Sequence, residues 1–251
     1  MDLGVTERLQ PILDDVRAFI KDRVIPVDEE FLAEVDQGDR WGQTARQTEI
    51  LEGLKAEARE RGLWNFWLTD SDRGPGLTTV EYAYIAEETG RAHIAAECFN
   101  CSAPDTGNME VLERFGSDAQ KAEWLEPLLN GEMRSAFAMS DPDVASSDAT
   151  NIAMSAVLED GKWVLNGEKT YISGAGDNRC KLLICMVKTN PENARHQQHS
   201  QILVPMDTPG VEVLRPMGVF SMDDAPHGHL SLIHISEPTR PNAPSRIPSS
   251  A

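Results

Sequence analysis

The chain has 251 residues, of which 40% are hydrophobic, enough for one large domain or two ordinary ones with buried cores. Its 41 acidic residues outnumber 23 basic ones, and the formal net charge is −18. No basic stripe interrupts this acidity, which argues against nucleic acid and anionic membranes as partners. No apolar run reaches the ~20 residues of a membrane span, and the N-terminus lacks a secretory signal. We therefore expect a cytoplasmic protein of a bacterium, or a protein of an organelle matrix.

The first 130 residues have the periodicity of helices. Apolar residues spaced by three and four predict one helix that Pro26 ends and a second that stops at Gly62. A capping box, in which Ser or Thr precedes Glu or Gln by three residues, predicts two further helix starts. These lie at Thr78–Glu81 and Ser117–Gln120, and a short helix is expected over 109–115.

From about residue 136 the apolar residues come in short runs that are typical of strands. Asp160-Gly161 and Asn166-Gly167 are both hairpin signals, because these dipeptides favour turns with positive φ. The apolar run 182–187 predicts a buried strand, and two more strands are expected over 201–205 and 211–214. The sequence thus predicts an α+β fold, with an all-α N-terminal domain over 1–131 and an antiparallel β domain over 132–229.

The last part of the chain, 230–251, differs in character. It holds four prolines, and the run Leu230–Arg240 resembles the translation of a sequencing adaptor. We therefore expect a non-native, disordered tail and leave it out of the fold prediction. The alternative is a natural strand around Leu230 and Leu232, followed by a disordered tail rich in proline and serine.

Two stretches carry hydroxyl groups beside small residues, at 137–148 and at 170–174. Their hydroxyls and backbone amides could donate hydrogen bonds to a carbonyl-rich ring such as a flavin. Serine and aspartate also favour turns for local reasons, so the chemistry alone favours an ordinary loop.

Several motifs in order resemble the acyl-CoA dehydrogenase family over about residues 10–229. The loop Phe137-Ala138-Met139-Ser140-Asp141-Pro142, followed by Asp143-Val144-Ala145-Ser146-Ser147-Asp148, is similar to the family's flavin-contacting loop. The segment Trp163–Lys169 running into Tyr171-Ile172-Ser173-Gly174 is similar to a second family motif, and so is the stretch Phe115–Lys121.

The resemblance implies the family's N-terminal helical and middle β domains, without its C-terminal helical bundle, so the chain is expected to be a fragment. It also implies a flavoprotein of fatty acid oxidation, an oxidoreductase that dehydrogenates a fatty acyl-CoA between Cα and Cβ with FAD as the hydride acceptor. The implied partners are the acyl-CoA substrate and an electron-transfer flavoprotein, and the full-length protein is expected to be a homo-oligomer. The family's catalytic base lies in the absent domain, so no catalytic residue is assigned and the chain alone is expected to be inactive.

Carried over by position, the resemblance implies cofactor contacts from both stretches. Ser147 is also expected to contact the substrate, lying between flavin and acyl-CoA. Tyr171 stands where the family usually has tryptophan; it keeps a stacking face with less area. The predicted cofactor-binding residues are Phe137, Met139, Ser140, Ser146, Ser147, Tyr171, Ile172 and Ser173.

The remaining candidates favour structural roles. The cysteine pairs Cys98/Cys101 and Cys180/Cys185 are separated by 78 intervening residues, so we expect reduced, partly buried thiols and no metal site. Glu87, Glu88 and Arg91 are expected on a solvated helix face. Alternatives to the dehydrogenase are an acyl-CoA oxidase or flavin monooxygenase of the same superfamily, or a non-catalytic scaffold.

Overall fold

The computed structural model describes residues 4–37, 42–69, 71–216, 227–238 and 246–248. Two compact units divide between Thr106 and Gly107, one of helices and one built around a sheet. Among the described residues, no helix is both long and apolar enough to cross a membrane. The helical-then-sheet order confirms the predicted fold class.

The first helix of unit 1 continues where we expected proline to end it. Helix α1 (Leu9–Phe19) passes through a π-helical turn (Ile20–Val24) into α2 (Ile25–Ala33). Pro26 therefore stands in the first turn of α2, where its missing N–H leaves no hydrogen bond unmade. The prediction that Pro26 ends the helix was wrong because a π-turn resets the hydrogen-bond pattern just before it.

The next helices of unit 1 begin and end where local signals place them. Thr44 and Thr78 each form a complete capping box, at the starts of α3 (Ala45–Glu60) and α4 (Thr79–Thr89). Gly62 adopts a φ of 72° after α3, as a helix-terminating glycine does. The remaining described elements of unit 1 are a 3₁₀ turn (Glu34–Gln37) and α5 (Ala95–Cys98).

A line of apolar side chains on α1 forms much of the core of unit 1. They recur at spacings of three and four, so they share one helix face, and all four are fully buried: Leu9, Leu13, Val16 and Phe19. The Phe19 ring lies 5.4 Å from that of Phe99, which in turn lies 5.9 Å from Phe66. These tilted aromatic contacts extend the core across the unit.

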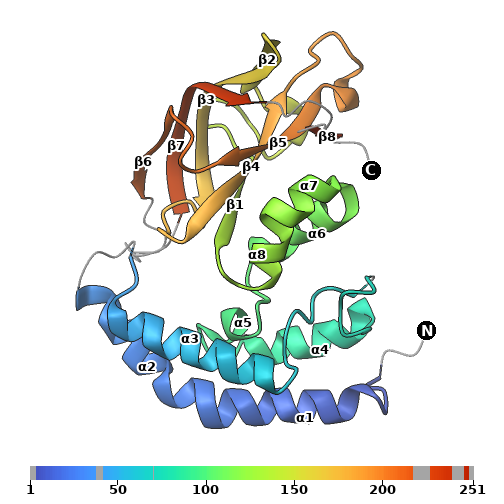
Figure 1. Ribbon diagram of the computed structural model, residues 1–251, viewed down its shortest axis with the longest axis vertical. Coiled ribbons are helices and arrows are strands. Elements are labelled where there is room, and N and C mark those ends of the chain that lie inside the picture. The colour runs from blue at the N-terminus through green and yellow to red at the C-terminus, as the bar shows by residue number, and fades with distance from the viewer. Residues whose placement is uncertain (1–3, 38–41, 70, 217–226, 239–245, 249–251) are drawn as a thin grey trace. The chain divides into compact units, whose positions relative to one another are not determined.

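Unit 2 begins with short helices that lie beside its sheet near β1 (Figure 1). The predicted capping box at Ser117 is present, with Gln120 as its reciprocal partner. The Asn108 side-chain amide donates a 2.9 Å hydrogen bond to the Ser135 hydroxyl and so ties the first helix to the first strand. The helical segments are α6 (Asp105–Phe115), α7 (Asp118–Gln120), a π-turn (Lys121–Leu125) and α8 (Glu126–Leu129).

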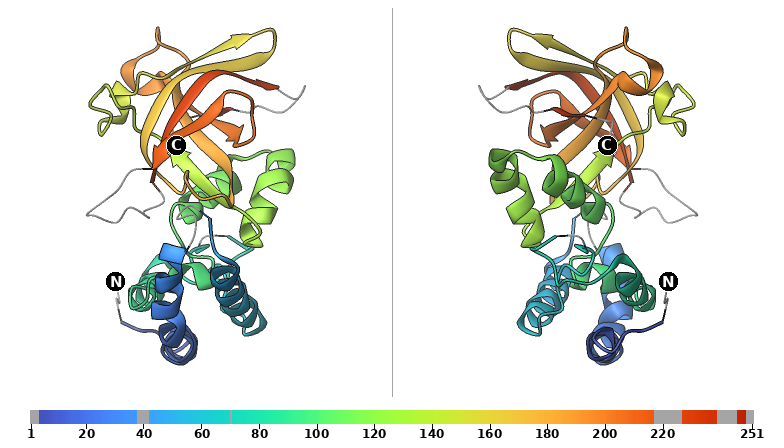
Figure 2. Two further views of the ribbon diagram at one scale, coloured as in Figure 1. Left: turned by 90° about the vertical axis from the view of Figure 1, so that its left-hand side faces the viewer. Right: turned by 90° about the vertical axis from the view of Figure 1, so that its right-hand side faces the viewer.

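The described strands of unit 2 form one curved sheet, visible from two sides in Figure 2. Its order is β6-β7-β3-β2-β4-β5-β8, with β1 also paired to β4. The strands are β1 (Arg134–Ala138), β2 (Ser155–Glu159), β3 (Lys162–Ser173), β4 (Cys180–Lys188), β5 (His199–Pro205), β6 (Val211–Pro216), β7 (His227–Pro238) and β8 (Arg246–Pro248).

The sheet is mixed rather than purely antiparallel as we predicted. Strand β1 pairs with β4 in parallel, and β2 makes one parallel bridge to β4. The chain reaches β4 from β1 only after a long loop and the β2–β3 hairpin. No tight turn therefore forces the β1–β4 pair to run antiparallel.

Only one of the two predicted hairpin dipeptides makes a hairpin. Asp160 (φ 48°) and Gly161 (φ 76°) form the two-residue turn between β2 and β3. Asn166-Gly167 lies instead inside β3, which pairs with β7 along this stretch, so that hairpin prediction was wrong. A Cβ at Gly167 would lie 2.8 Å from Cγ of Met154. This close approach of the Met154 side chain explains why the position is glycine.

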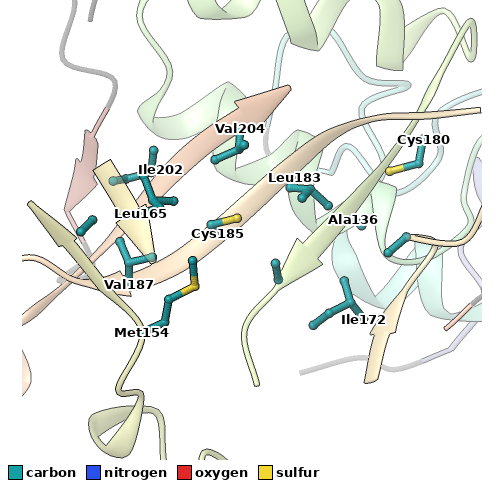
Figure 3. Close-up of a cluster of buried hydrophobic side chains, with 13 residues drawn as sticks. Ala136, Met154, Leu165, Ile172, Cys180, Leu183, Cys185, Val187, Ile202 and Val204 are labelled. Carbon is teal, nitrogen blue, oxygen red and sulfur yellow. The ribbon is translucent and has the colours of Figure 1, made fainter. Parts of the chain in front are cut away.

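Thirteen buried hydrophobic residues fill the core of unit 2, and Figure 3 labels ten of them. Strand β4 contributes most heavily, since the predicted buried run from Leu182 to Val187 is almost wholly shielded from solvent. Met154, just before β2, and Ile172, near the end of β3, join this cluster.

Strand β7 covers residues on both sides of position 230, where we expected a tail to begin. Residues 230–238 pair with β3, and 246–248 pair with β5. Within 230–251 the described residues are thus strand, while the origin of this stretch stays a prediction. The domain boundary predicted near 132 also stays a prediction; the compact units divide earlier, because α6 to α8 group with the sheet.

Candidate functional site

The end of β1 carries the first predicted contact residues. Phe137 pairs with Ile184 of the central strand β4, and its side chain is half-buried. Met139 and Ser140 follow the strand directly and are also half-buried. Strand β1 thus anchors these three residues at the margin of the core, with part of each side chain accessible to a ligand.

The loop after β1 separates two neighbouring serines. The buried Ser146 hydroxyl accepts a hydrogen bond from the Asp141 N–H and donates one to its carbonyl oxygen, both at 3.1 Å. Ser147 is exposed. Ser146 therefore closes the loop through its hydroxyl, while Ser147 lies at the surface.

The end of β3 contains a β-bulge at Thr170 and Tyr171. Pairing with β7 shifts register between Lys169 and Ile172, and Tyr171 adopts a φ of 57°. An aromatic residue with positive φ is a rare, strained conformation, and such outliers gather at functional sites. The bulge leaves the Tyr171 side chain 63% exposed.

The residues beside Tyr171 are held more firmly. Ile172 is 1% exposed and belongs to the core, so any contact it makes with a ligand comes from its backbone. Ser173 is half-buried.

A hydrogen bond joins the two predicted stretches at this bulge. The Thr170 N–H donates to the Ser140 carbonyl oxygen at 2.8 Å. Segments about thirty positions apart in sequence therefore meet. A flavin site built from both stretches requires this. The junction bonds the half-buried Ser140 to the residue just before Tyr171, whose side chain is exposed.

A buried ion pair beneath this junction was assigned no role from the sequence. Lys169 is fully buried, and its ammonium group contacts the Asp141 carboxylate at 2.6 Å. A lysine flanked by Glu168 and Thr170 predicts a solvated position, so periodicity gave no signal of its burial.

The acidic cluster on α4 differs from our expectation of a solvated face. Glu87 and Arg91 are exposed, but Glu88 is 8% exposed and contacts both Arg17 (2.7 Å) and Arg91 (3.1 Å). These arginines hold the pKa of Glu88 below its usual range against the opposing effect of burial. The cluster ties α1 to α4 and has the character of a structural ion pair.

The four cysteines are buried thiols that form no disulfide, as we expected of a reduced structural set. Burial raises the pKa of Cys101 to about 12, which disfavours the reactive thiolate. Within the described part of the chain, no group of His, Cys, Asp and Glu side chains is arranged to hold a metal ion.

A hollow of about 680 Å³ lies near the turn that follows Ser173. Its described lining mixes apolar and charged side chains, and none of the eight predicted contact residues is among them. The residues that line the hollow are Trp124, Ala175, Gly176, Asp177, Asn178, Cys180, Lys181, Met206, Asp207 and Val213. The surface around Ser140 and Tyr171 is therefore distinct from this hollow.

Comparison with known proteins identifies the family. The family model for the N-terminal domain of acyl-CoA dehydrogenases matches residues 6–132, and the model for the middle domain matches residues 136–234. The chain belongs to the acyl-CoA dehydrogenase family. Both hydroxyl-bearing stretches fall within the middle-domain match.

Similar family members are known from several organisms. Acyl-CoA dehydrogenase family member 10 of Mus musculus is 48% identical over 90% of this chain and 21% of its own length. Acyl-CoA dehydrogenase family member 11 of Homo sapiens is 45% identical over 92% of this chain and 30% of its own. The chain thus spans between a fifth and a third of the length of these two relatives.

Solved acyl-CoA dehydrogenase structures share the fold. One from Mycobacterium abscessus is 47% identical, with a TM-score of 0.86, covering 94% of this chain and 60% of that one. Another, complexed with FAD and from Bacillus anthracis, is 26% identical with a TM-score of 0.68, covering 93% of this chain and 37% of that one.

Proposed function

We propose that this chain forms part of the flavin- and acyl-CoA-contacting surface of a flavin-dependent dehydrogenase. The protein would act on the CH–CH bond of a fatty acyl-CoA in fatty acid oxidation, with FAD as the hydride acceptor. Family membership supports the reaction class, and the FAD complex of the Bacillus anthracis relative supports the cofactor. The single observation that carries the proposal is the hydrogen-bonded junction of Ser140 with Thr170 beside the bulged Tyr171.

The residues at this junction fit a flavin in chemical type. A flavin edge is a line of nitrogen atoms and carbonyl groups, which calls for hydroxyl and amide donors. Ser140 and Ser173 bring hydroxyl groups that are only partly buried, and Tyr171 brings an exposed aromatic face. When bound, FAD supplies the acceptor for the hydrogen that leaves Cβ of the substrate.

The residues of this chain would bind and orient rather than react. Tyr171 would cover part of the ring and keep water from it, since its side chain projects from the bulge. Ser140 and Ser173 would fix the ring by hydrogen bonds. Exposed Ser147 is proposed to lie between cofactor and acyl-CoA. Because a thioester α-proton is a weak acid, its removal needs a carboxylate base and donors to the thioester carbonyl, and we assign neither to this chain.

The partners are proposed from the family resemblance. They are the acyl-CoA substrate and an electron-transfer flavoprotein as electron acceptor, with a homo-oligomeric full-length protein. The proposed location is the bacterial cytoplasm or an organelle matrix.

Two assays on the purified chain test the proposal. Titration with FAD, followed by quenching of flavin fluorescence, should show saturable but weak binding; no binding at millimolar FAD would contradict the proposed surface and favour a scaffold. Acyl-CoA-dependent reduction of a dye should be undetectable for the chain alone, since we assign no base in it. Turnover near that of an intact family member would overturn that expectation, and oxygen consumption with peroxide release in the full-length protein would indicate an oxidase.

A further inference from the structure

Lys169 is the most completely buried charged side chain among the described residues of unit 2. Its ammonium group donates three hydrogen bonds, the number of its protons: to the Asp141 carboxylate (2.6 Å), the Met139 carbonyl (2.8 Å) and the Met186 carbonyl (2.7 Å). One side chain of β3 thereby holds the end of β1 and the central strand β4.

Asp141 completes the same cluster. Its second carboxylate oxygen accepts hydrogen bonds from the N–H groups of Ala153 (2.6 Å) and Met154 (2.9 Å), just before β2. Its backbone N–H and carbonyl both bond to the Ser146 hydroxyl. The pair thus links the β1 end, the following loop, the approach to β2, and strands β3 and β4.

The pair adjoins, along the chain and through hydrogen bonds, the residues proposed to contact the flavin. Met139 supplies a carbonyl to Lys169, Ser140 stands between that residue and Asp141, and Tyr171 comes two residues after Lys169 along β3. The hydrogen bond from Thr170 to Ser140 joins the residue after Lys169 to the residue before Asp141. A displacement of either charge would therefore move the hydroxyl and the ring that are proposed to meet the flavin.

We infer that Asp141 and Lys169 are a positioning pair that holds the Ser140–Thr170 junction and the bulged Tyr171 in the arrangement needed for flavin binding. Its consequence for the cofactor rests on the proposed function, while its effect on the junction does not. The pair acts through its neighbours and does not touch the cofactor itself.

Physical chemistry indicates why ordinary packing does not account for the pair. Burying two charges is costly because both lose their hydration, and apolar residues of similar volume often stabilise a core as well or better. Burial lowers the pKa of Lys169, and the bond to Asp141 opposes that effect. What an apolar pair cannot do is satisfy two carbonyl oxygens and two N–H groups from three different segments, and these bonds are what align the junction.

Hydrogen–deuterium exchange on the full 251-residue chain tests the junction without any cofactor. Asp141→Asn should speed exchange of the amides at 140 and 170–173 by at least ~tenfold, while amides of β5 keep their rates. Asp141→Glu keeps the charge and should return the junction rates to within about threefold of the parent. Asp177→Asn, which removes the partner of Arg179 outside this cluster, is the matched control and should leave the junction unchanged.

A double variant covers the case in which Asp141→Asn fails to fold. Asp141→Leu with Lys169→Met removes both charges and leaves no unpaired ion, so we expect this double variant to fold. The junction amides should still exchange at least ~tenfold faster. Unchanged junction rates, or acceleration spread evenly over the whole sheet, would overturn the inference.

FAD titration of the same variants tests the consequence for the cofactor. The dissociation constant for FAD should rise at least ~tenfold in Asp141→Asn and change by less than about twofold in Asp177→Asn. If the parent chain binds no FAD, the proposed function fails, while the exchange rates still decide whether the pair positions the junction. Fast junction exchange with undiminished FAD affinity would refute the positioning role.

Discussion

Gly167 gives the sharpest prediction about how the strands behind the site are packed. A Cβ at this position would lie 2.8 Å from Cγ of Met154, 3.2 Å from its Cβ and 3.5 Å from its Cα. Met154 is 4% exposed and belongs to the core cluster of Figure 3, so it has little room to move. Rotating the methionine side chain relieves only the first contact. The φ of 153° adds a backbone conformation that favours glycine.

From these distances we expect Gly167→Ala to lower the free energy of unfolding by about 3 kcal/mol. Overpacking a core costs about 1–3 kcal/mol, and a strained backbone conformation about 1–3 kcal/mol. The assay is urea unfolding of unit 2, followed by circular dichroism and tryptophan fluorescence. Gly107→Ala is the matched control, because that glycine is helical and exposed and has no atom within 4 Å of its Cβ position; it should be neutral or slightly stabilising.

A double-mutant cycle separates the two causes. Met154→Ala removes the closest contact, so its cost should be smaller in the Gly167→Ala background by about 1–2 kcal/mol. A loss below about 0.5 kcal/mol for Gly167→Ala, with no coupling to Met154, would refute the close-approach explanation.

Three further changes test other parts of the structure. Tyr171→Ala should weaken FAD binding at least ~tenfold but change stability by less than about 0.5 kcal/mol, because the ring is 63% exposed; equal FAD affinity would contradict the stacking role. Leu13→Ala should cost unit 1 about 2–5 kcal/mol in urea unfolding, since Leu13 is fully buried; a loss under about 1 kcal/mol would contradict the described core. Glu81 accepts hydrogen bonds from Arg8, Thr6 and Thr78, which hold its pKa far below its usual range, so its contribution is present at neutral pH and lost on acidification. Glu81→Gln should therefore be less stable than the parent at pH 7, with the gap closing between about pH 5 and about pH 2; a constant gap would show that the ion pair contributes nothing.

Features set by neighbouring residues could be predicted from the sequence. The capping boxes at Thr78 and Ser117 need only a partner three positions away, and both form. The turn at Asp160-Gly161 likewise depends on the φ preferences of two adjacent residues.

Two other features could not be predicted from adjacent residues in this way. Pro26 has a helix-ending signal, but the π-turn before it moves it into a first helical turn. Asn166-Gly167 has a hairpin signal, but pairing of β3 with β7 continues through it and Met154 requires the glycine. A change of hydrogen-bond pattern along the helix outweighs the local preference at Pro26, and a tertiary partner outweighs it at Gly167.

The sequence predicted the two stretches of the site, but not the contacts that hold them together. The family motifs pointed to 137–148 and 170–174, and the bond from Thr170 to Ser140 joins them. The bulge at Tyr171 and the burial of Lys169 depend on how β3 lies against β7, β1 and β4 at once. A single sequence gives no direct signal of such three-way packing.

The measurement that tests the central claim most directly is a titration of the isotopically labelled chain with FAD, followed by amide chemical shifts. The account predicts that the largest shifts fall on Phe137–Ser140, on Ser147 and on Tyr171–Ser173, on both sides of the Ser140–Thr170 bond. Shifts confined to other surfaces, such as the hollow lined by Trp124 and Lys181, would contradict it.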